Sequence, residues 1–220
     1  MRLLFYLKIW TTVAVTLSCG LIAKDEKCRP TSHDVYGPYY VPNPPPLLQF
    51  CTGDLKYSQP HTLLVHGKVY ESDCHTPMPF VRIEIWQADH NGDYKMSTDC
   101  RGFLYTDDNG YYEFSTIHPG KYTTDPDGHL FRPAHLHFKI FGRREHKNLV
   151  TQMYFFGDSN LAKNDSCHVC SSDRKDLIVR PQPYCESPGD EECIEMAEFN
   201  IILEKGEGTS ATYADYDYGY

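Results

Sequence analysis

The chain has 220 residues and a formal net charge of −9 at pH 7, and 40% of its residues are hydrophobic. An acidic chain without a basic cluster disfavours nucleic acid and anionic membrane surfaces as partners, because both attract positive charge. The length suits one domain that can bury a sizeable core.

Residues 1–23 have the composition of a secretory signal peptide. Arg2 and Lys8 are their only charges, and the remainder up to Ala23 is mostly apolar or small. We predict a signal peptide that is removed after Gly20 or Ala23; an uncleaved anchor is the alternative. Removing both positive charges changes the net charge from −9 to −11. We expect a secreted chain that makes no membrane contact after removal.

Eight of the nine cysteines follow the predicted signal peptide, which contains the ninth, Cys19. An even number in an oxidising compartment predicts up to four disulfides, whose connectivity the sequence leaves open. A zinc site formed by Cys167, Cys170, Cys185 and Cys193 is the alternative, and it would require reduced thiolates.

Residues 24–60 are rich in proline and tyrosine and contain the run Pro44-Pro45-Pro46. Proline interrupts helices, so we predict an extended, irregular arm that lies over the body of the domain.

The body, residues 61–205, has the alternation of apolar and polar residues typical of strands. We expect strands over 61–70, 79–88, 110–117, 134–141, 149–156 and 196–204. No segment has the pattern of an amphipathic helix of normal length. The predicted fold is therefore all-β: a disulfide-braced sandwich of mostly antiparallel strands with long irregular loops. Residues 206–220, rich in Tyr, Asp and Gly, are predicted to form a disordered tail.

Two histidines lie on one face of the strand predicted over 134–141. Alternate side chains share a face, so His135 and His137 project together with Lys139. Two imidazoles on a rigid strand provide half of a metal site. The alternative is a pair of strand histidines, one packed and one solvated.

Tyr94 and Tyr122 are the candidate partners of these histidines. A phenol has an ordinary pKa near 10, so it ligates at neutral pH only to a cation that holds it as phenolate. Ferric iron fits, since it accepts phenolate oxygen and imidazole nitrogen. Simple packing of both tyrosines is the alternative, as is a zinc or copper enzyme that uses the histidines alone.

Five segments in order resemble the intradiol ring-cleavage dioxygenases, the family of catechol, hydroxyquinol and protocatechuate dioxygenases. The resemblance covers roughly residues 37–158. Its segments are Gly37-Pro38-Tyr39-Tyr40, Trp86-Gln87-Ala88 leading to Tyr94, residues 110–122 ending in Tyr122, Arg132-Pro133-Ala134-His135-Leu136-His137 and Thr151-Gln152-Met153-Tyr154-Phe155.

The resemblance implies a mononuclear non-haem Fe(III) site held by Tyr94, Tyr122, His135 and His137. Tyr122 resembles the tyrosinate that leaves when substrate binds, and Tyr94 the one that stays. Arg132 resembles the family's active-site arginine, which would stabilise negative charge on the ring. Gln152 is the third candidate catalytic residue; orienting substrate and forming a core hydrogen bond remain its two interpretations.

The implied reaction cleaves a catecholic ring between its two hydroxyl-bearing carbons and inserts both atoms of O₂ to give a cis,cis-muconate-type diacid. The partners would be small catechols or polyphenols and O₂, in catabolism or detoxification of phenolics. The chain lacks the N-terminal helical region of bacterial catechol dioxygenases and resembles the shorter secreted eukaryotic members, so we expect a monomer. The alternative function is a non-catalytic secreted binding protein on the same fold.

Overall fold

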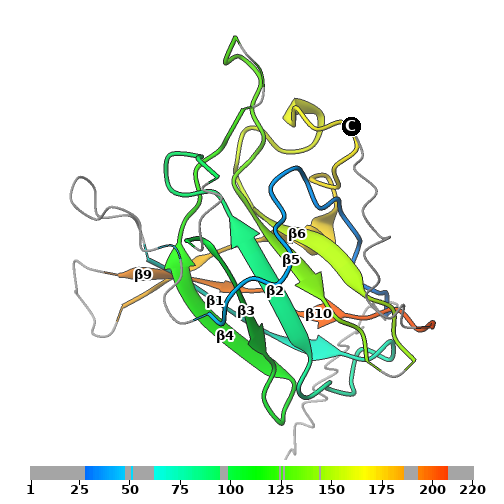
Figure 1. Ribbon diagram of the computed structural model, residues 1–220. Helices are drawn as coiled ribbons and strands as arrows, with labels where there is room; N and C mark the ends of the chain where they lie inside the picture. Colours follow the sequence, from blue (N-terminus) through cyan, green and yellow to red (C-terminus); the bar gives the residue numbers. More distant parts are fainter. Residues whose placement is uncertain are drawn as a thin grey trace, which may run out of the picture.

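Two β-sheets pack face to face in the part of the chain that this computed structural model describes (Figure 1). The described residues are 28–47, 51, 62–94, 99–123, 125, 127–143, 145–185 and 193–207. The predicted signal peptide, residues 24–27, 48–50 and 52–60 of the predicted arm and residues 208–220 of the predicted tail lie outside them. Within the described residues, no helix is long and apolar enough to cross a membrane.

The first sheet is organised around its central strand, β1. β1 pairs antiparallel with β4 on one side and parallel with β9 and β10 on the other, and β8 extends the sheet beyond β9. Its strands are β1 (Thr62–Tyr70), β4 (Tyr111–Ile117), β8 (Gln182–Tyr184), β9 (Ile194–Glu198) and β10 (Ile201–Ile202).

The second sheet has the order β3-β2-β5-β6-β7 and is antiparallel except for the pairing of β6 with β7. Its strands are β2 (Arg82–Gln87), β3 (Arg101–Tyr105), β5 (His135–Ile140), β6 (Leu149–Phe155) and β7 (Ile178–Val179). Single 3₁₀ turns, η1 (Ala162–Asn164) and η2 (Lys175–Leu177), lie in the connection from β6 to β7.

The core lies between the sheets and is built from alternate residues of their strands. In β1, β2 and β5 the inward side chains are fully buried, and they are Leu63, Val65, Val69, Ile83, Ile85, Leu136, Phe138 and Ile140. Burial of this continuous apolar layer holds the sheets together. The predicted all-β sandwich is confirmed.

All six predicted strands are present, and the last is divided in two. Asn200 interrupts it, because its side-chain Oδ1 accepts the hydrogen bond of the Lys68 N–H (2.9 Å) in β1. A backbone carbonyl would accept that bond in a continuous ladder. The sequence analysis did not predict β3, β7 or β8. β3 begins Arg101-Gly102, which breaks the alternation, yet it pairs with β2 along its whole length.

The outer face of the second sheet is buried as well, because the N-terminal arm crosses it. Figure 1 shows the blue arm passing over β2 and β5. The arm is fixed to the sheet edges by backbone hydrogen bonds from Asp34 N–H to Val150 O (2.8 Å) and from Leu47 N–H to Phe103 O (2.9 Å). Trp86, His135 and His137 on this face are at most 2% exposed. The polar face of β5 is therefore an interior, suited to a buried site.

Four disulfides brace the loops: Cys28–Cys74, Cys51–Cys100, Cys167–Cys170 and Cys185–Cys193. The four cysteines of the alternative zinc site form two of these bonds. That alternative is therefore excluded, and the disulfide interpretation is confirmed.

Candidate metal centre

His135 and His137 lie side by side on the outer face of β5, and their Nε2 atoms are 3.1 Å apart. His135 Nδ1 donates to the carbonyl of Pro133 (2.7 Å), which assigns the proton to Nδ1 and leaves a lone pair on Nε2. A backbone carbonyl bound to the second ring nitrogen is the usual way in which a ligating histidine is oriented.

The His137 ring is held by stacking. It lies parallel to the indole of Trp86, with ring centroids 4.7 Å apart and planes inclined by 5°. Its Nδ1 is buried beside the backbone of Val35, which favours a proton on the ring, but the contact does not have the geometry of a full hydrogen bond. On another side the backbone of Gly37 approaches the ring so closely that a Cβ there would be 3.3 Å from His137 Cε1.

Two loops bring the tyrosines to these histidines. The Tyr94 hydroxyl is 3.1 Å from His135 Nε2, and the rings of Tyr94 and Tyr122 meet edge to face with centroids 5.2 Å apart. The loops touch where Gly92 has a positive φ of 88° and a Cβ would lie 2.2 Å from the Lys121 carbonyl. Only glycine fits there, so the spacing Gly92-Asp93-Tyr94 is part of the site geometry.

Burial sets the protonation of the four side chains. It lowers the pKa of both His135 and His137 well below the ordinary histidine value, and the Arg132 charge acts in the same direction. It raises the pKa of Tyr94 and Tyr122 above the ordinary phenol value, against the opposing effect of Arg132. At neutral pH the imidazoles are therefore neutral, and the phenols keep their protons until a cation displaces them.

The donor set fits a trivalent hard cation with borderline nitrogen ligands. Metal–nitrogen bonds of about 2.1 Å separate two ligands of one ion by roughly 3 Å when they meet at a right angle, and the imidazole nitrogens have this separation. Among the described residues no group of three or more His, Cys, Asp or Glu side chains could hold a metal ion. A metal here would therefore depend on the tyrosines in addition to the histidines.

Arg132 lies beside the cluster in a buried network. Its backbone N–H donates to the Tyr122 carbonyl (2.7 Å). Its Nε and Nη2 donate to the two oxygens of Asp165 (3.0 and 3.2 Å), and Nη2 also donates to Tyr154 Oη (2.9 Å) and Gln152 Oε1 (3.1 Å). Burial opposes its charge, but Tyr154 and Asp165 outweigh that effect and raise the pKa of Arg132. It is a permanent cation next to Tyr122.

Gln152 lies beside Arg132, and both its side-chain oxygen and its side-chain nitrogen are hydrogen-bonded to protein groups. Its Oε1 accepts from Arg132, and its Nε2 donates to the Val35 carbonyl (2.8 Å). This geometry favours orienting Arg132 over direct contact with substrate. The assignment of Gln152, like those of the other site residues, stays a prediction.

The structure adds residues that the sequence analysis did not assign to the site. Tyr39 stacks on Tyr94, with centroids 4.3 Å apart, and meets Tyr122 edge to face at 5.8 Å. Tyr154 lies two residues after Gln152 on the same face of β6, so strand alternation could have identified it. Asp34 and Asp165 come from irregular segments, for which the sequence has no comparable signal.

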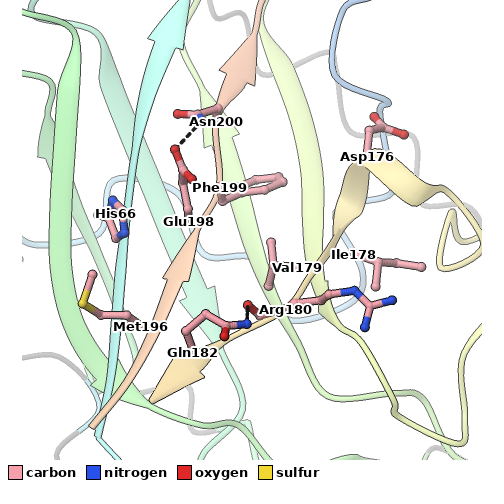
Figure 2. Close-up of a pocket in the computed structure, with 10 residues that line it drawn as sticks. All are labelled: His66, Asp176, Ile178, Val179, Arg180, Gln182, Met196, Glu198, Phe199 and Asn200. Atoms are coloured by element: carbon pink, nitrogen blue, oxygen red, sulfur yellow. Dashed lines mark hydrogen bonds between the residues drawn. The ribbon is translucent and has the colours of Figure 1, made fainter. Parts of the chain in front are cut away.

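A surface pocket of about 520 Å³ lies elsewhere, between the outer face of the first sheet and the segment that contains η2 and β7 (Figure 2). Figure 2 shows His66 of β1 with Met196 and Glu198 of β9 on one side, and Val179 of β7 with Arg180 on the other. None of the predicted site residues lines this pocket. It is therefore separate from the metal centre.

Most of the chain is similar to known proteins. A protein-family model described as "Dioxygenase" matches residues 35–205, which include all the predicted site residues. Catechol 1,2-dioxygenase of Acinetobacter baylyi is 32% identical over 149 residues, covering 58% of this chain and 47% of that protein. Hydroxyquinol 1,2-dioxygenase of Rhodococcus opacus is 30% identical over 198 residues, covering 79% of this chain and 63% of that protein. The chain spans less than two thirds of the length of either relative.

Solved structures share the fold. 3-Chlorocatechol 1,2-dioxygenase of Rhodococcus opacus 1CP superposes with a TM-score of 0.68 at 25% identity, covering 82% of this chain and 75% of that one. The dioxygenase domain of a dioxygenase–carbohydrate-binding fusion from Streptomyces sp. SirexAA-E superposes with a TM-score of 0.61 at 26% identity. That match covers 81% of this chain and 100% of the domain, so the sandwich described here corresponds to a whole domain of that fusion.

Proposed function

The chain belongs to the intradiol ring-cleavage dioxygenase family, and on this premise we propose that it is a non-haem Fe(III) dioxygenase that cleaves catechols between the two hydroxyl-bearing carbons. The proposed products are cis,cis-muconate-type diacids that contain both atoms of O₂. The observation that carries the proposal is the convergence of Tyr94, Tyr122, His135 and His137 in one buried cluster beside a permanent cation, Arg132.

The four side chains would hold the iron through two phenolate oxygens and two Nε2 atoms. When bound, ferric iron would supply the Lewis acidity that keeps phenols and a catechol deprotonated and makes the catecholate reactive toward O₂. Zinc or copper on the histidines alone is less favourable, since it leaves two buried tyrosines 5.2 Å apart without a role.

Tyr122 is suited to take a proton from an arriving catechol. Burial raises its pKa, so its phenolate is a stronger base than an exposed tyrosinate once it leaves the metal. The released hydroxyl would remain hydrogen-bonded to Arg132, whose guanidinium lies beside it. Tyr94 has its hydroxyl 3.1 Å from His135 Nε2 and suits the ligand that stays.

Arg132 would bind and orient the substrate. Its bonds to Asp165, Gln152 and Tyr154 use Nε and Nη2, and Tyr122 also accepts from the guanidinium. Because Nη1 carries two N–H groups, the side chain can serve Tyr122 and an anionic catechol oxygen together. A cation preorganised in a buried site stabilises the negative charge that develops on the ring.

We also propose that the protein is secreted as a monomer and acts in catabolism or detoxification of phenolics. The apolar segment before Lys24 and the four disulfides support export through an oxidising compartment. Expression with the native leader, followed by N-terminal sequencing of the mature chain from the medium, tests secretion, and size-exclusion chromatography tests the monomeric state.

The decisive experiment is a visible absorption spectrum of the iron-loaded protein before and after anaerobic addition of catechol. We expect a broad tyrosinate-to-iron band that shifts to longer wavelength when catechol binds. Tyr94→Phe and Tyr122→Phe should each weaken the band. Tyr112→Phe is the control, because Tyr112 is also a buried phenol but donates to the Phe199 carbonyl beside the first sheet (2.6 Å). A protein that stays colourless after iron loading would contradict the ferric site and favour a non-catalytic binding protein.

A further inference from the structure

A four-residue disulfide loop borders the Arg132 network. Asp165, the carboxylate that holds Arg132 side-on, is followed two residues later by Cys167, which is bonded to Cys170. The Cys167 N–H donates to Asp165 Oδ1 (2.9 Å), the oxygen that accepts from Arg132 Nε. The start of the loop therefore fixes the carboxylate that fixes the arginine.

The end of the loop reaches the same network from the other side. The Ser171 N–H donates to Asp34 Oδ2 (3.0 Å), and the Ser171 hydroxyl donates to the His33 carbonyl (3.0 Å). Asp34 Oδ2 also accepts from the Tyr154 hydroxyl (2.7 Å), whose oxygen accepts from Arg132 Nη2. Backbone N–H groups at both ends of one short loop thus orient the two carboxylates that border Arg132 and Tyr154.

The Cys167–Cys170 bond contributes little to global stability by chain entropy. Its cysteines are 3 residues apart, against 8, 46 and 49 for the other disulfides. The entropy that a cross-link removes from the unfolded chain grows with the loop that it closes. The loop is also at the surface, with Val169 61% exposed. A cross-link of this kind acts chiefly by restricting the local backbone.

We infer that the Cys167–Cys170 loop is a positioning element that holds Asp165 against Arg132 and so aims the guanidinium at the catecholic substrate. The inference rests on the proposed function. A free arginine side chain has many rotamers, and fixing it before substrate arrives removes that ordering cost from binding. The loop does not contact the substrate. It restricts the Arg132 guanidinium through the hydrogen bonds of Cys167 to Asp165 and of Ser171 to Asp34.

The test compares a Cys167→Ser/Cys170→Ser double variant with the wild-type protein. The control is Cys185→Ser/Cys193→Ser, which removes the other short-range disulfide. Asp165→Asn is the second variant: it keeps all four disulfides and replaces the carboxylate that accepts from Arg132. Oxygen uptake with catechol gives KM and kcat, and thermal unfolding reports on stability.

We expect KM for catechol to rise about tenfold in the loop variant, because a charge-assisted hydrogen bond is loosened. The value of kcat should change by less than about threefold, since the iron ligands are untouched. Asp165→Asn should raise KM at least as much. The control should keep the wild-type KM, although its midpoint of thermal unfolding falls by at least as much as that of the loop variant.

A second readout uses the metal-free protein and does not depend on activity. In nuclear magnetic resonance spectra the Arg132 Nε–H, bound to Asp165 at 3.0 Å, should exchange slowly in the wild-type protein and in the control. It should exchange at least about tenfold faster in the loop variant, once the carboxylate can move. Unchanged KM and unchanged Nε–H exchange in the loop variant would overturn the inference, as would equal increases of KM in the control. If the wild-type protein fails to cleave catechol but Nε–H exchange still depends on Cys167–Cys170, the proposed function is refuted. The role of the loop in positioning Arg132 would then still be supported.

Discussion

Replacing Gly37 with alanine tests how closely the arm is fitted to the metal centre. Gly37 has φ +68°, and a Cβ added there would meet His137 Cε1 at 3.3 Å. Gly128, also at φ +68° but with no atom within 4 Å of such a Cβ, is the matched control. Both substitutions place alanine in the left-handed region, so each should lower the free energy of unfolding by about 1–2 kcal/mol.

Only Gly37→Ala should change the metal site. The added methyl group displaces the His137 ring by a few tenths of an ångström, beyond the roughly 0.2 Å to which metal–ligand distances are held. Stacking on Trp86 restricts the ring from turning away. Changes that misorient a ligand typically cost about 10- to 100-fold in metal affinity, and we expect a loss of this size.

The assay is a competitive chelator titration followed through the tyrosinate-to-iron band, with urea unfolding of the metal-free variants measured in parallel. Equal iron affinities for Gly37→Ala and Gly128→Ala would refute the reasoning. They would mean that the arm can move away from His137 at no cost to the site.

Three further predictions concern the stability of the folded chain. Trp86→Ala should lower the free energy of unfolding by about 3–5 kcal/mol, because it leaves a large cavity against His137; urea unfolding measures it, and a loss below about 1 kcal/mol would contradict the packing described. The cysteines of the Cys28–Cys74 disulfide are 46 residues apart. Removing this bond by a double serine substitution should lower the free energy of unfolding by about 4 kcal/mol, according to the chain-entropy relation for a loop of this length. An unchanged unfolding midpoint would exclude that contribution. Hydrogen bonds from the side chain and N–H of Thr76 lower the pKa of Asp73 from 3.8 to about 2, so its contribution is present above pH 3.8 and lost as the pH falls toward 2. Asp73→Asn should therefore lose less stability than wild type over that interval, and parallel stability–pH curves would exclude this role.

Strand alternation was sufficient to predict the layers of the sandwich and one face of the site. The inward residues of β1 and β5 follow from a period of two, and the same period places His135 and His137 together. Neither periodicity nor composition could locate Tyr94 and Tyr122 relative to them. Their meeting depends on a loop contact at Gly92, and the resemblance to a known family supplied that information.

The strand and the site residue that the sequence did not predict depend on tertiary contacts. β3 has an arginine and a glycine at its start, and it forms a strand because β2 and the arm at Leu47 offer it hydrogen-bonding partners. Asp165 pairs with Arg132 across 33 residues. Irregular segments carry no periodic pattern, so their partners could be identified only in the folded chain.

The parallel pairing of β1 with β9 and β10 has a consequence for how the molecule is made. β1 pairs with β9 and β10, which follow some 130 residues later along the chain, so the first sheet can close only after residues 194–202 have been made. Non-local pairing of this kind slows folding, because the intervening loop must be ordered before the contact forms. The arm is anchored to the same late strand, since the Thr31 N–H donates to the Ile202 carbonyl (3.0 Å). Closure over Trp86 and His137 is therefore expected only after β10 has been made, and the proposed iron would bind after that point.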